Sequence, residues 1–309
     1  MRFGRFFLFT GMQFAIAVGL FYLVAPTVLA KEIGHPWAIL GWAFIFGLPL
    51  SLFEYIYHRY LLHSAVLPFL GSMHKAHTLH HSLTSVKAPV KGKAPEELVP
   101  VKSEYPVEYE HQVEAMEFPL YAVSIFLAIF TVLIGIPCKL MFPGSPAILA
   151  IFVGVTCFYS GYELWHAVLH LPYDQFWRPA MDHQKIGKPV RRIYAFHLMH
   201  HWRPSANLAI VGFWGVAVWD YAFRTHRRPG NLPLQGASVS YFDAAMKRPY
   251  WPIALLDRWQ AGLYRWSRRV EAWSAQVFLR RKLSHAVVGS PTVDPIESEA
   301  TPVGSGKSS

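Results

Sequence analysis

The stretch from His74 to His81, HKAHTLHH, constrains this chain more than any other part of it. On a helix with about 100° between residues, its four histidines at i, i+3, i+6 and i+7 share one face. Packing alone does not favour this pattern, because neighbouring imidazoles desolvate one another and repel when protonated. Neutral imidazole nitrogens that converge on one point form a metal site. The stretch therefore predicts a helix that ligates metal.

Three further histidine boxes follow the same principle. They are HxxxxH at His58 and His63, HxxxH at His166 and His170, and HxxHH at His197, His200 and His201. The HxxxH spacing puts two rings one helical turn apart, as in helical zinc and iron sites. The HxxxxH spacing puts its rings about 140° apart on an ideal helix. Those two rings converge only if the helix ends or bulges between them, or if they serve opposite sides of a site.

Without His74, the boxes supply ten nitrogen donors: His58, His63, His77, His80, His81, His166, His170, His197, His200 and His201. One ion of ordinary coordination number cannot use all of them, so the sequence predicts two metal ions. The role of His74 is left open between a ligand and a neighbour of the ligands. Glu54, Glu163 and His183 are further candidates, either as ligands or as groups that orient an imidazole N–H.

The apolar character of the chain indicates a membrane protein. It is 53% hydrophobic and 16% charged, which is rich in apolar surface for a soluble domain. An uncharged run over residues 6–30 is too long for the core of a signal peptide and long enough to cross a membrane. Runs at 37–56, 118–136 and 147–165 predict three more spans. We expect an all-α integral membrane protein with about four transmembrane helices, capped by a cytoplasmic helical domain that carries the boxes.

Charge predicts the orientation of these spans. All but two of the 29 lysines and arginines lie on the side that carries the boxes, the exceptions being Lys31 and Lys139 in the short turns 31–36 and 137–146. The positive-inside rule places that side and both termini in the cytoplasm, in a bacterial inner membrane or the endoplasmic reticulum. The formal charge of +10 fits an anionic membrane surface and an acidic redox partner. No nucleic-acid-binding motif accompanies it, so we expect no nucleic-acid partner.

We divide the chain into four parts. Residues 1–30 form the first transmembrane helix, 31–228 a catalytic domain, 229–283 an amphipathic basic helical extension, and 284–309 a disordered tail rich in Pro, Ser, Gly and Thr. In the extension, Leu, Trp and Val recur every three or four residues among arginines. This pattern suits a helix on an anionic leaflet or one packed on the catalytic domain.

Two segments outside the boxes complete the sequence prediction. Residues 82–117 are polar and contain four prolines, which predicts a solvated loop that serves as a lid or a plain linker. Residues 208–223 are apolar but too short and interrupted to span, which predicts a membrane-surface or half-inserted helix.

The location of the boxes favours iron over the other metals that imidazole binds, namely zinc and copper. A polyhistidine site just outside four apolar spans faces hydrocarbon substrates. Their unactivated C–H bonds require dioxygen chemistry rather than hydrolysis. We therefore expect two iron ions with O2 as co-substrate, and zinc as an alternative occupant in a purified sample.

The segments EYIYHRYLLH, HTLHH, HAVLH and YAFHLMHHW, followed by Trp219–Asp220 and Thr225, resemble the fatty acid hydroxylase/sterol desaturase superfamily of integral-membrane di-iron oxygenases. The resemblance covers roughly residues 50–228. It implies that the ten box histidines ligate iron and that a lipid chain or ring gains a hydroxyl group. The chain lacks the fused cytochrome-b5-like domain of the fatty acid 2-hydroxylase branch, carries a long polar loop after His81, and lacks the segment ending in paired prolines that follows that box there. These differences leave the substrate open.

Several functions are compatible with these boxes. The leading hypothesis is a hydroxylase of a fatty acyl, sterol-like or other isoprenoid lipid. A desaturase of the same lipids and a carotenoid-type ring hydroxylase share the oxidant, and a non-redox membrane metal-binding protein is the alternative from another class. The chain has no nucleotide-binding glycine motif and no iron–sulfur cysteine set, so an oxygenase needs a separate electron donor of ferredoxin, cytochrome or reductase type.

Overall fold

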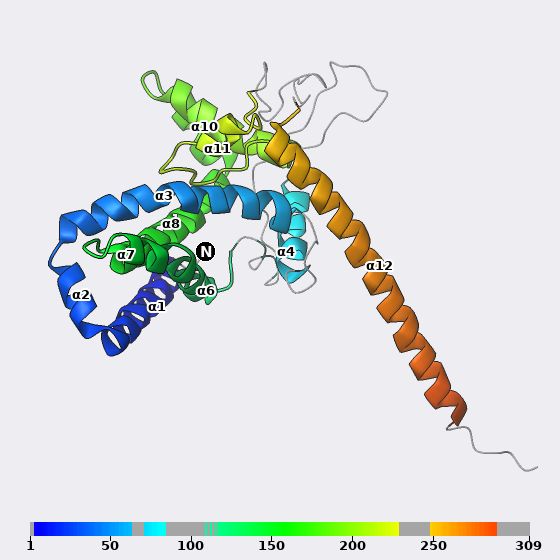
Figure 1. The fold of residues 1–309 in the computed structure, drawn as a ribbon. Coiled ribbons are helices and arrows are strands. Elements are labelled where there is room, and N and C mark those ends of the chain that lie inside the picture. Colours follow the sequence, from blue (N-terminus) through cyan, green and yellow to red (C-terminus); the bar gives the residue numbers. More distant parts are fainter. Residues whose placement is uncertain are drawn as a thin grey trace, which may run out of the picture. The chain divides into compact units, whose positions relative to one another are not determined.

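The computed structural model describes residues 3–63, 71–84, 109, 112, 115, 117–228 and 248–288 (Figure 1). In this part of the chain all regular structure is helical, and a single bridge between Phe213 and Val216 is the one β-type pairing. The predicted all-α class is therefore confirmed for the described residues. The chain divides into two compact units, Met1–Tyr264 and Arg265–Ser309.

The elements follow one another along the chain in this order. They are α1 Phe3–Val24, α2 Pro26–Ile33, α3 Pro36–Tyr57, η1 His58–Leu62, α4 Gly71–Leu83, α6 Ala122–Phe130, η3 Thr131–Gly135, α7 Ile136–Met141, α8 Ala147–Leu169, η4 Tyr173–Trp177, α9 Arg178–Asp182, α10 Gly187–Trp202, α11 Val218–Ala222 and α12 Trp251–Val288. The η elements are π-helical turns, with hydrogen bonds between residues five apart.

Four helical segments are long and apolar enough to cross a membrane. They are Gly4–Val24, Pro36–Leu62, Ala122–Met141 and Ala147–Leu169. On α1 the side chains of Leu8, Met12, Ile16 and Leu20 recur every fourth residue and are all exposed. An exposed apolar stripe of this kind is stable against hydrocarbon rather than water. The predicted number of spans is confirmed.

The first helix ends earlier than its sequence predicts. We expected a span as far as Ala30 and a turn from Lys31, but α1 ends at Val24 and α2 begins at Pro26. The proline ring disfavours a helical conformation in the residue before it, and Ala25 accordingly has φ −146° and ψ 62°. Pro26 itself fits the start of a helix, where its missing N–H would have had no partner.

The other spans also differ from their predicted bounds. The third begins at Ala122 rather than 118, because Pro119 precedes it, and it continues through η3 and α7 to Met141. The second and fourth spans continue to Leu62 and Leu169. The histidines of their boxes therefore lie on the helices themselves or directly at their ends, which fixes the rings more firmly than a loop would.

Helices α3, α6 and α8 enclose the main apolar core. Leu50 of α3, Leu127 of α6 and Val155 of α8 are all buried in it. The rings of Phe53 and Phe130 meet edge to face with their centroids 4.9 Å apart. Figure 1 shows α3 and α8 side by side, the arrangement that brings the ends of both spans to one place.

A buried ion pair closes the opposite end of the spans. The Nζ of Lys139 lies 2.9 Å from Oε1 of Glu32, whose other oxygen accepts the amide of Leu149 at 2.8 Å. The pair joins α2, α7 and α8. It neutralises one of the two basic residues that the sequence analysis placed on this side.

The prediction of a helix over residues 208–223 is wrong. Only α11, over Val218–Ala222, is helical there, and the residues before it form a loop. Gly212 has a φ of +57°, a conformation that a residue with a Cβ rarely adopts. The loop amides bind the carboxylates of Glu54 and Asp220 instead of helical carbonyls. The part of the segment before α11 is thus an apolar loop, and its residues 208–210 are buried.

Two predicted segments fall largely outside the described residues. They are the polar loop, of which 85–108 is not described, and the tail from residue 289 onward. Helix α12 continues to Val288, past residue 284 where the tail was predicted to begin. In the sequence, Gly289, Ser290 and Pro291 follow, and glycine and proline are residues that commonly end a helix.

The close approach of α3 to the loop gives a test of this packing. A Cβ added at Gly47 would overlap the indole ring of Trp214, whose Nε1 donates to the carbonyl of Phe44 at 2.9 Å. We expect Gly47→Ala to lower the free energy of unfolding by about 1–3 kcal/mol, the usual cost of overpacking. Unfolding in detergent, followed by tryptophan fluorescence, measures it.

The matched control lies on the same helix. A Cβ at Gly41 has no atom within 4 Å, so Gly41→Ala should leave the stability equal or raise it through its better helix propensity. Equal destabilisation by both variants would contradict the contact between α3 and the loop.

Candidate metal centre

The structure brings the ten box histidines together in two groups of five. Group A consists of His58, His63, His77, His81 and His200, and group B of His80, His166, His170, His197 and His201. Within each group, one nitrogen of every ring lies within 4.8 Å of the chosen nitrogens of the others. All of group B is buried, while two members of group A are half-buried. Each group could hold a metal ion.

Each HxxHH box divides its histidines between the two groups. On α4, His77 and His81 lie one turn apart and belong to group A, while His80 belongs to group B. Helix α10 repeats this division with the groups exchanged, since His197 and His201 join group B and the histidine between them joins group A. Each group thus contains two pairs and one histidine from the opposite box, so neither is complete without both helices.

A π-helical turn brings together the two histidines of the HxxxxH box. Helix α3 continues into η1, and the amide of His63 donates to the carbonyl of His58 five residues earlier at 3.3 Å. The wider turn brings the two rings to a centroid distance of 5.1 Å with only 13° between their planes. This is the bulge that the sequence required for the two rings to converge.

The ring nitrogens approach one another at the spacing of metal ligands. In group A the Nε2 atom of His77 lies 3.2 Å from that of His58 and 3.1 Å from that of His63. In group B the Nε2 atoms of His170 and His197 are 2.8 Å apart. Two nitrogens at about 2.1 Å from an ion and at right angles to each other are about 3.0 Å apart. The observed separations therefore fit a shared ion.

Backbone carbonyls set which nitrogen of two group A rings points inward. The Nδ1–H of His58 donates to the carbonyl of Leu208 at 2.6 Å, and that of His200 donates to the carbonyl of Ala206 at 3.0 Å. A proton on Nδ1 leaves Nε2 with a lone pair directed into the group. Both residues are buried, so no water competes for these bonds.

The rings outside the spans are held neutral by their surroundings. Burial lowers the pKa of each well below the ordinary histidine value, and the neighbouring imidazoles lower it further, in His63, His77, His80, His197, His200 and His201. For His81, burial lowers the pKa to about 3. At neutral pH these rings carry a free lone pair, the form that binds metal.

The carboxylate of Asp220 holds the loop that supplies the carbonyls. It accepts the amides of Leu208 and Ala209 at 3.0 Å each, and the hydroxyl of Thr225 at 2.7 Å. Trp219, beside it, donates to the Oγ of Ser51 on α3 at 2.9 Å. The WD pair and the threonine noted in the sequence are therefore parts of the support of the site.

Glu54 binds the same loop rather than a ring. Its two oxygens accept the amides of Ile210, Val211 and Gly212 at 2.8, 2.9 and 2.8 Å. We expected it to be a ligand or to orient an imidazole directly. Glu54 acts on the His58 ring indirectly, because it fixes the loop whose Leu208 carbonyl accepts the hydrogen bond from that ring.

The remaining sequence candidates lie outside both groups. Glu163 accepts the amide of Phe118 at 2.9 Å. The Nδ1 of His74 donates to the carbonyl of Leu62 at 2.9 Å, which ties α4 to the end of η1. His183 is exposed, and its Nδ1 accepts the amide of Lys185 at 3.2 Å.

The first turns of α12 hold η1 in place, a contribution that the sequence analysis missed. The guanidinium of Arg59 donates through Nε and Nη2 to both oxygens of Asp257, at 2.9 and 2.8 Å. The hydroxyl of Tyr60 donates to the same carboxylate at 2.9 Å. The signal for this contact is faint, because a single Asp in a basic helix reads as a surface charge.

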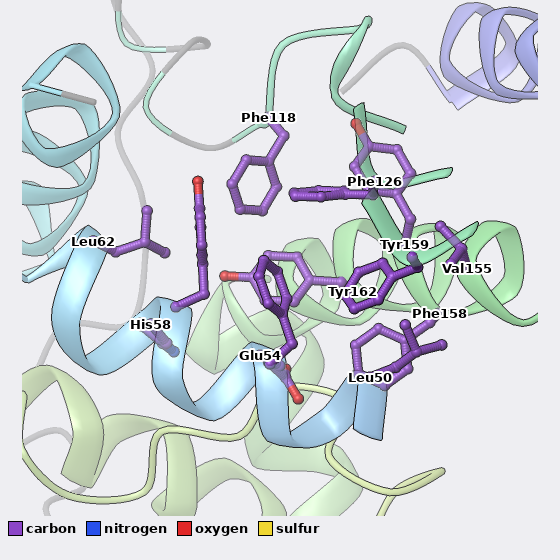
Figure 2. Close-up of a pocket in the computed structure, with 13 residues that line it drawn as sticks. Leu50, Glu54, His58, Leu62, Phe118, Phe126, Val155, Phe158, Tyr159 and Tyr162 are labelled. Carbon is purple, nitrogen blue, oxygen red and sulfur yellow. The ribbon is translucent and has the colours of Figure 1, made fainter. Parts of the chain in front are cut away.

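An apolar cavity of about 50 Å³ lies among α3, α6 and α8 beside group A. Figure 2 shows the rings of Phe118 and Phe126 facing α3 across it, with His58 and Leu62 near one end and Leu50 at the other. Its walls are almost entirely hydrocarbon and aromatic. The cavity therefore suits an alkyl group rather than a polar molecule.

The donor set restricts which ion fits. Five neutral imidazoles per group exceed the four ligands of a structural zinc site, and they offer none of the carboxylate or carbonyl oxygens that calcium and magnesium require. Five ligands leave one position of an octahedron open. This donor set suits a transition metal ion of the kind that imidazole binds.

Comparison with known proteins adds no identification. No protein-family model matches the chain, and neither a curated protein nor a solved structure matches it. What this site does must therefore be argued from its own geometry.

The division of each HxxHH box predicts how paired variants lose metal. His81→Ala with His200→Ala removes two ligands of group A, whereas His80→Ala with His200→Ala removes one from each group. We expect the first pair to retain about one ion per chain and the second to weaken both sites and retain less than about one. Metal analysis of protein purified by size exclusion measures both.

His183→Ala serves as the control, because that ring is exposed and lies outside both groups. It should retain the wild-type metal content. Equal metal loss in the two paired variants would contradict the assignment of neighbouring histidines to different groups.

The support from Asp220 gives a second prediction. Asp220→Asn removes a charge that accepts three hydrogen bonds, so we expect a loss of about 2 kcal/mol in the free energy of unfolding. Because the loop orients His58 and His200, metal affinity should fall by about 10–100-fold. Chelator competition measures the affinity. Asp174→Asn, at an exposed position, should change neither quantity, and a similar loss there would argue against this role.

Proposed function

We propose that this chain is a membrane-embedded di-iron oxygenase of the fatty acid hydroxylase/sterol desaturase type that hydroxylates a lipid. The observation that carries the proposal is the pair of reciprocal five-histidine groups at the ends of apolar spans. Ten imidazoles, eight of them buried, need a cation where their nitrogens converge, and two groups in contact suit two cations that act together. The sequence resemblance points to the same chemistry.

The surroundings of group A support a hydrocarbon substrate. The apolar cavity lies between helices that are long enough to span a membrane, and His58 of group A is among its lining residues. An acyl chain or an isoprenoid can enter such a cavity from the lipid without leaving an apolar medium. Its size suits only part of a chain, so the rest of the substrate would remain among the helices or in the lipid.

Iron fits the proposal better than zinc, because an alkyl C–H bond offers nothing to a Lewis acid. When bound, two iron ions supply the reduction of dioxygen by two external electrons and the breaking of a C–H bond. The balanced reaction is RH + O2 + 2 e⁻ + 2 H⁺ → ROH + H2O. The residues of the chain contribute the neutral ligand set, its fixed orientation and a wall that keeps water from the alkyl group.

Access and orientation follow from the same arrangement. The half-buried members of the centre, His63 and His81, mark the side from which dioxygen and electrons approach. A separate donor protein delivers the electrons, and the positive-inside rule puts this side and both termini in the cytoplasm. In the extension, Trp259 and Leu263 are 64% and 51% exposed and alternate with arginines, which suits contact with an anionic leaflet.

Lipid mass spectrometry under ¹⁸O2 tests this function. Cells that express the wild type should contain lipids heavier by one labelled oxygen atom, and cells with His201→Ala should not, because group B loses a ligand. His183→Ala should match the wild type. The labelled species would also name the substrate.

The other outcomes separate the alternatives. Lipids lighter by two hydrogens, without label, would indicate a desaturase. Unchanged lipids together with zinc instead of iron in the purified protein would contradict the oxygenase and favour a non-redox metal-binding protein.

A further inference from the structure

A second, larger cavity of about 830 Å³ opens on a different face of α8. Its volume lies within the range of about 300–1,000 Å³ that is typical of sites for small molecules. It lies between α8, α10 and the loop over residues 209–217, and no histidine of group A or B lines it. We call it the α8–α10 groove. The proposed oxygenase chemistry gives it no role.

One face of α8 forms the apolar wall of the groove. Cys157, Gly161, Leu164, Trp165 and Val168 line it, at the i, i+4, i+7, i+8 and i+11 positions of one helical stripe. This stripe is about 16 Å long at 1.5 Å per residue. That is close to half of the hydrocarbon thickness of about 30 Å, the depth of one leaflet.

Basic side chains line another part of the groove. Arg192 of α10 and Arg228 are exposed, and both come from segments outside the four candidate spans. The Nη2 of Arg228 donates to the hydroxyl of Tyr221 at 3.3 Å, and the Tyr221 ring stacks on His226 with centroids 4.1 Å apart. The arginine is thus partly positioned. No acidic side chain is among the described residues that line the groove, so its charge calls for an anion.

We propose that the α8–α10 groove binds one anionic phospholipid of the surrounding leaflet. The phosphate lies at Arg192 and Arg228, and one acyl chain lies along the α8 stripe as far as Cys157. An apolar wall one leaflet deep next to two exposed arginines matches a molecule with an apolar chain and an anionic headgroup. A soluble anion would leave the wall exposed, and a neutral lipid would leave the arginines unused.

The groove also touches the support of the metal centre. Its lining residues Leu169 and Phe196 directly precede His170 and His197 of group B. Ala209 and Ile210, also in its lining, belong to the loop that orients His58. A bound lipid therefore packs against α8 and α10 on the side away from their histidines, and it should stabilise both helices.

Native mass spectrometry of the full-length, metal-loaded protein tests the proposal. After removal of co-purified lipid, dioleoylphosphatidylglycerol and dioleoylphosphatidylcholine are titrated separately. We expect one phosphatidylglycerol to bind preferentially. The double variant Arg192→Gln, Arg228→Gln should bind it about 25-fold more weakly, from about fivefold for each arginine near an anionic lipid.

Two further variants make the result specific. Lys185→Gln with Lys188→Gln removes the same charge from exposed positions outside the groove, and should keep the affinity within about threefold because distant charges are screened. Gly161→Leu fills part of the groove beside α8 but keeps every arginine. A Cβ at Gly161 would meet its nearest atoms, in Val211, at 3.7 Å or more, so the start of the new side chain fits without overlap. Gly161→Leu should also weaken the binding of phosphatidylglycerol. If the arginine variant fails to fold, this variant still tests whether the lipid binds in the groove.

Three outcomes would overturn the proposal. They are binding of phosphatidylcholine as tight as that of phosphatidylglycerol, equal weakening of binding by the lysine pair and the arginine pair, and displacement of the lipid by inorganic phosphate at similar concentration. The last result would identify a site for free phosphate. None of these measurements requires turnover or an electron donor, so a failure of the oxygenase proposal leaves their interpretation unchanged.

Discussion

The structure depends on keeping ten imidazoles packed against one another, eight of them buried. Their lone pairs repel unless a cation lies between them, and their N–H groups need acceptors that leave the inward nitrogens free. For His58 and His200, the chain meets the second requirement with the backbone carbonyls of Leu208 and Ala206. The fold of the loop that bears these carbonyls then becomes as important to the site as the histidines.

That loop explains the buried acids near the centre. Glu54 and Asp220 together accept five loop amides, which replace the hydrogen bonds that a helix would have supplied. Removing either carboxylate would leave buried amides without acceptors, an expensive state in an apolar medium. The acids therefore act on the metal centre through the backbone, and their distance from the rings is no sign of a minor role.

Groups A and B have the same composition, with the roles of the two HxxHH helices exchanged. Each contains a histidine pair from the end of a candidate span, a pair from an HxxHH helix, and one histidine from the other such helix. Because α4 and α10 each contribute to both groups, moving either helix disturbs both. This coupling ties the two candidate ion sites into one unit, and it also explains why the segments around α10, including the α8–α10 groove, bear on the whole centre.

The sequence by itself determined the helical class, the four spans and the ten histidines that come together, because apolar length and ligand spacing are local properties of the chain. Only the tertiary structure decided which histidines share a group, since adjacent residues such as His80 and His81 are separated by how helices pack and not by their order. It also replaced a predicted helix at 208–223 with a loop, because the acceptors Glu54 and Asp220 reach those amides only in the folded chain. Backbone carbonyls carry no mark in a sequence, so their role in orienting His58 and His200 could be seen only in three dimensions.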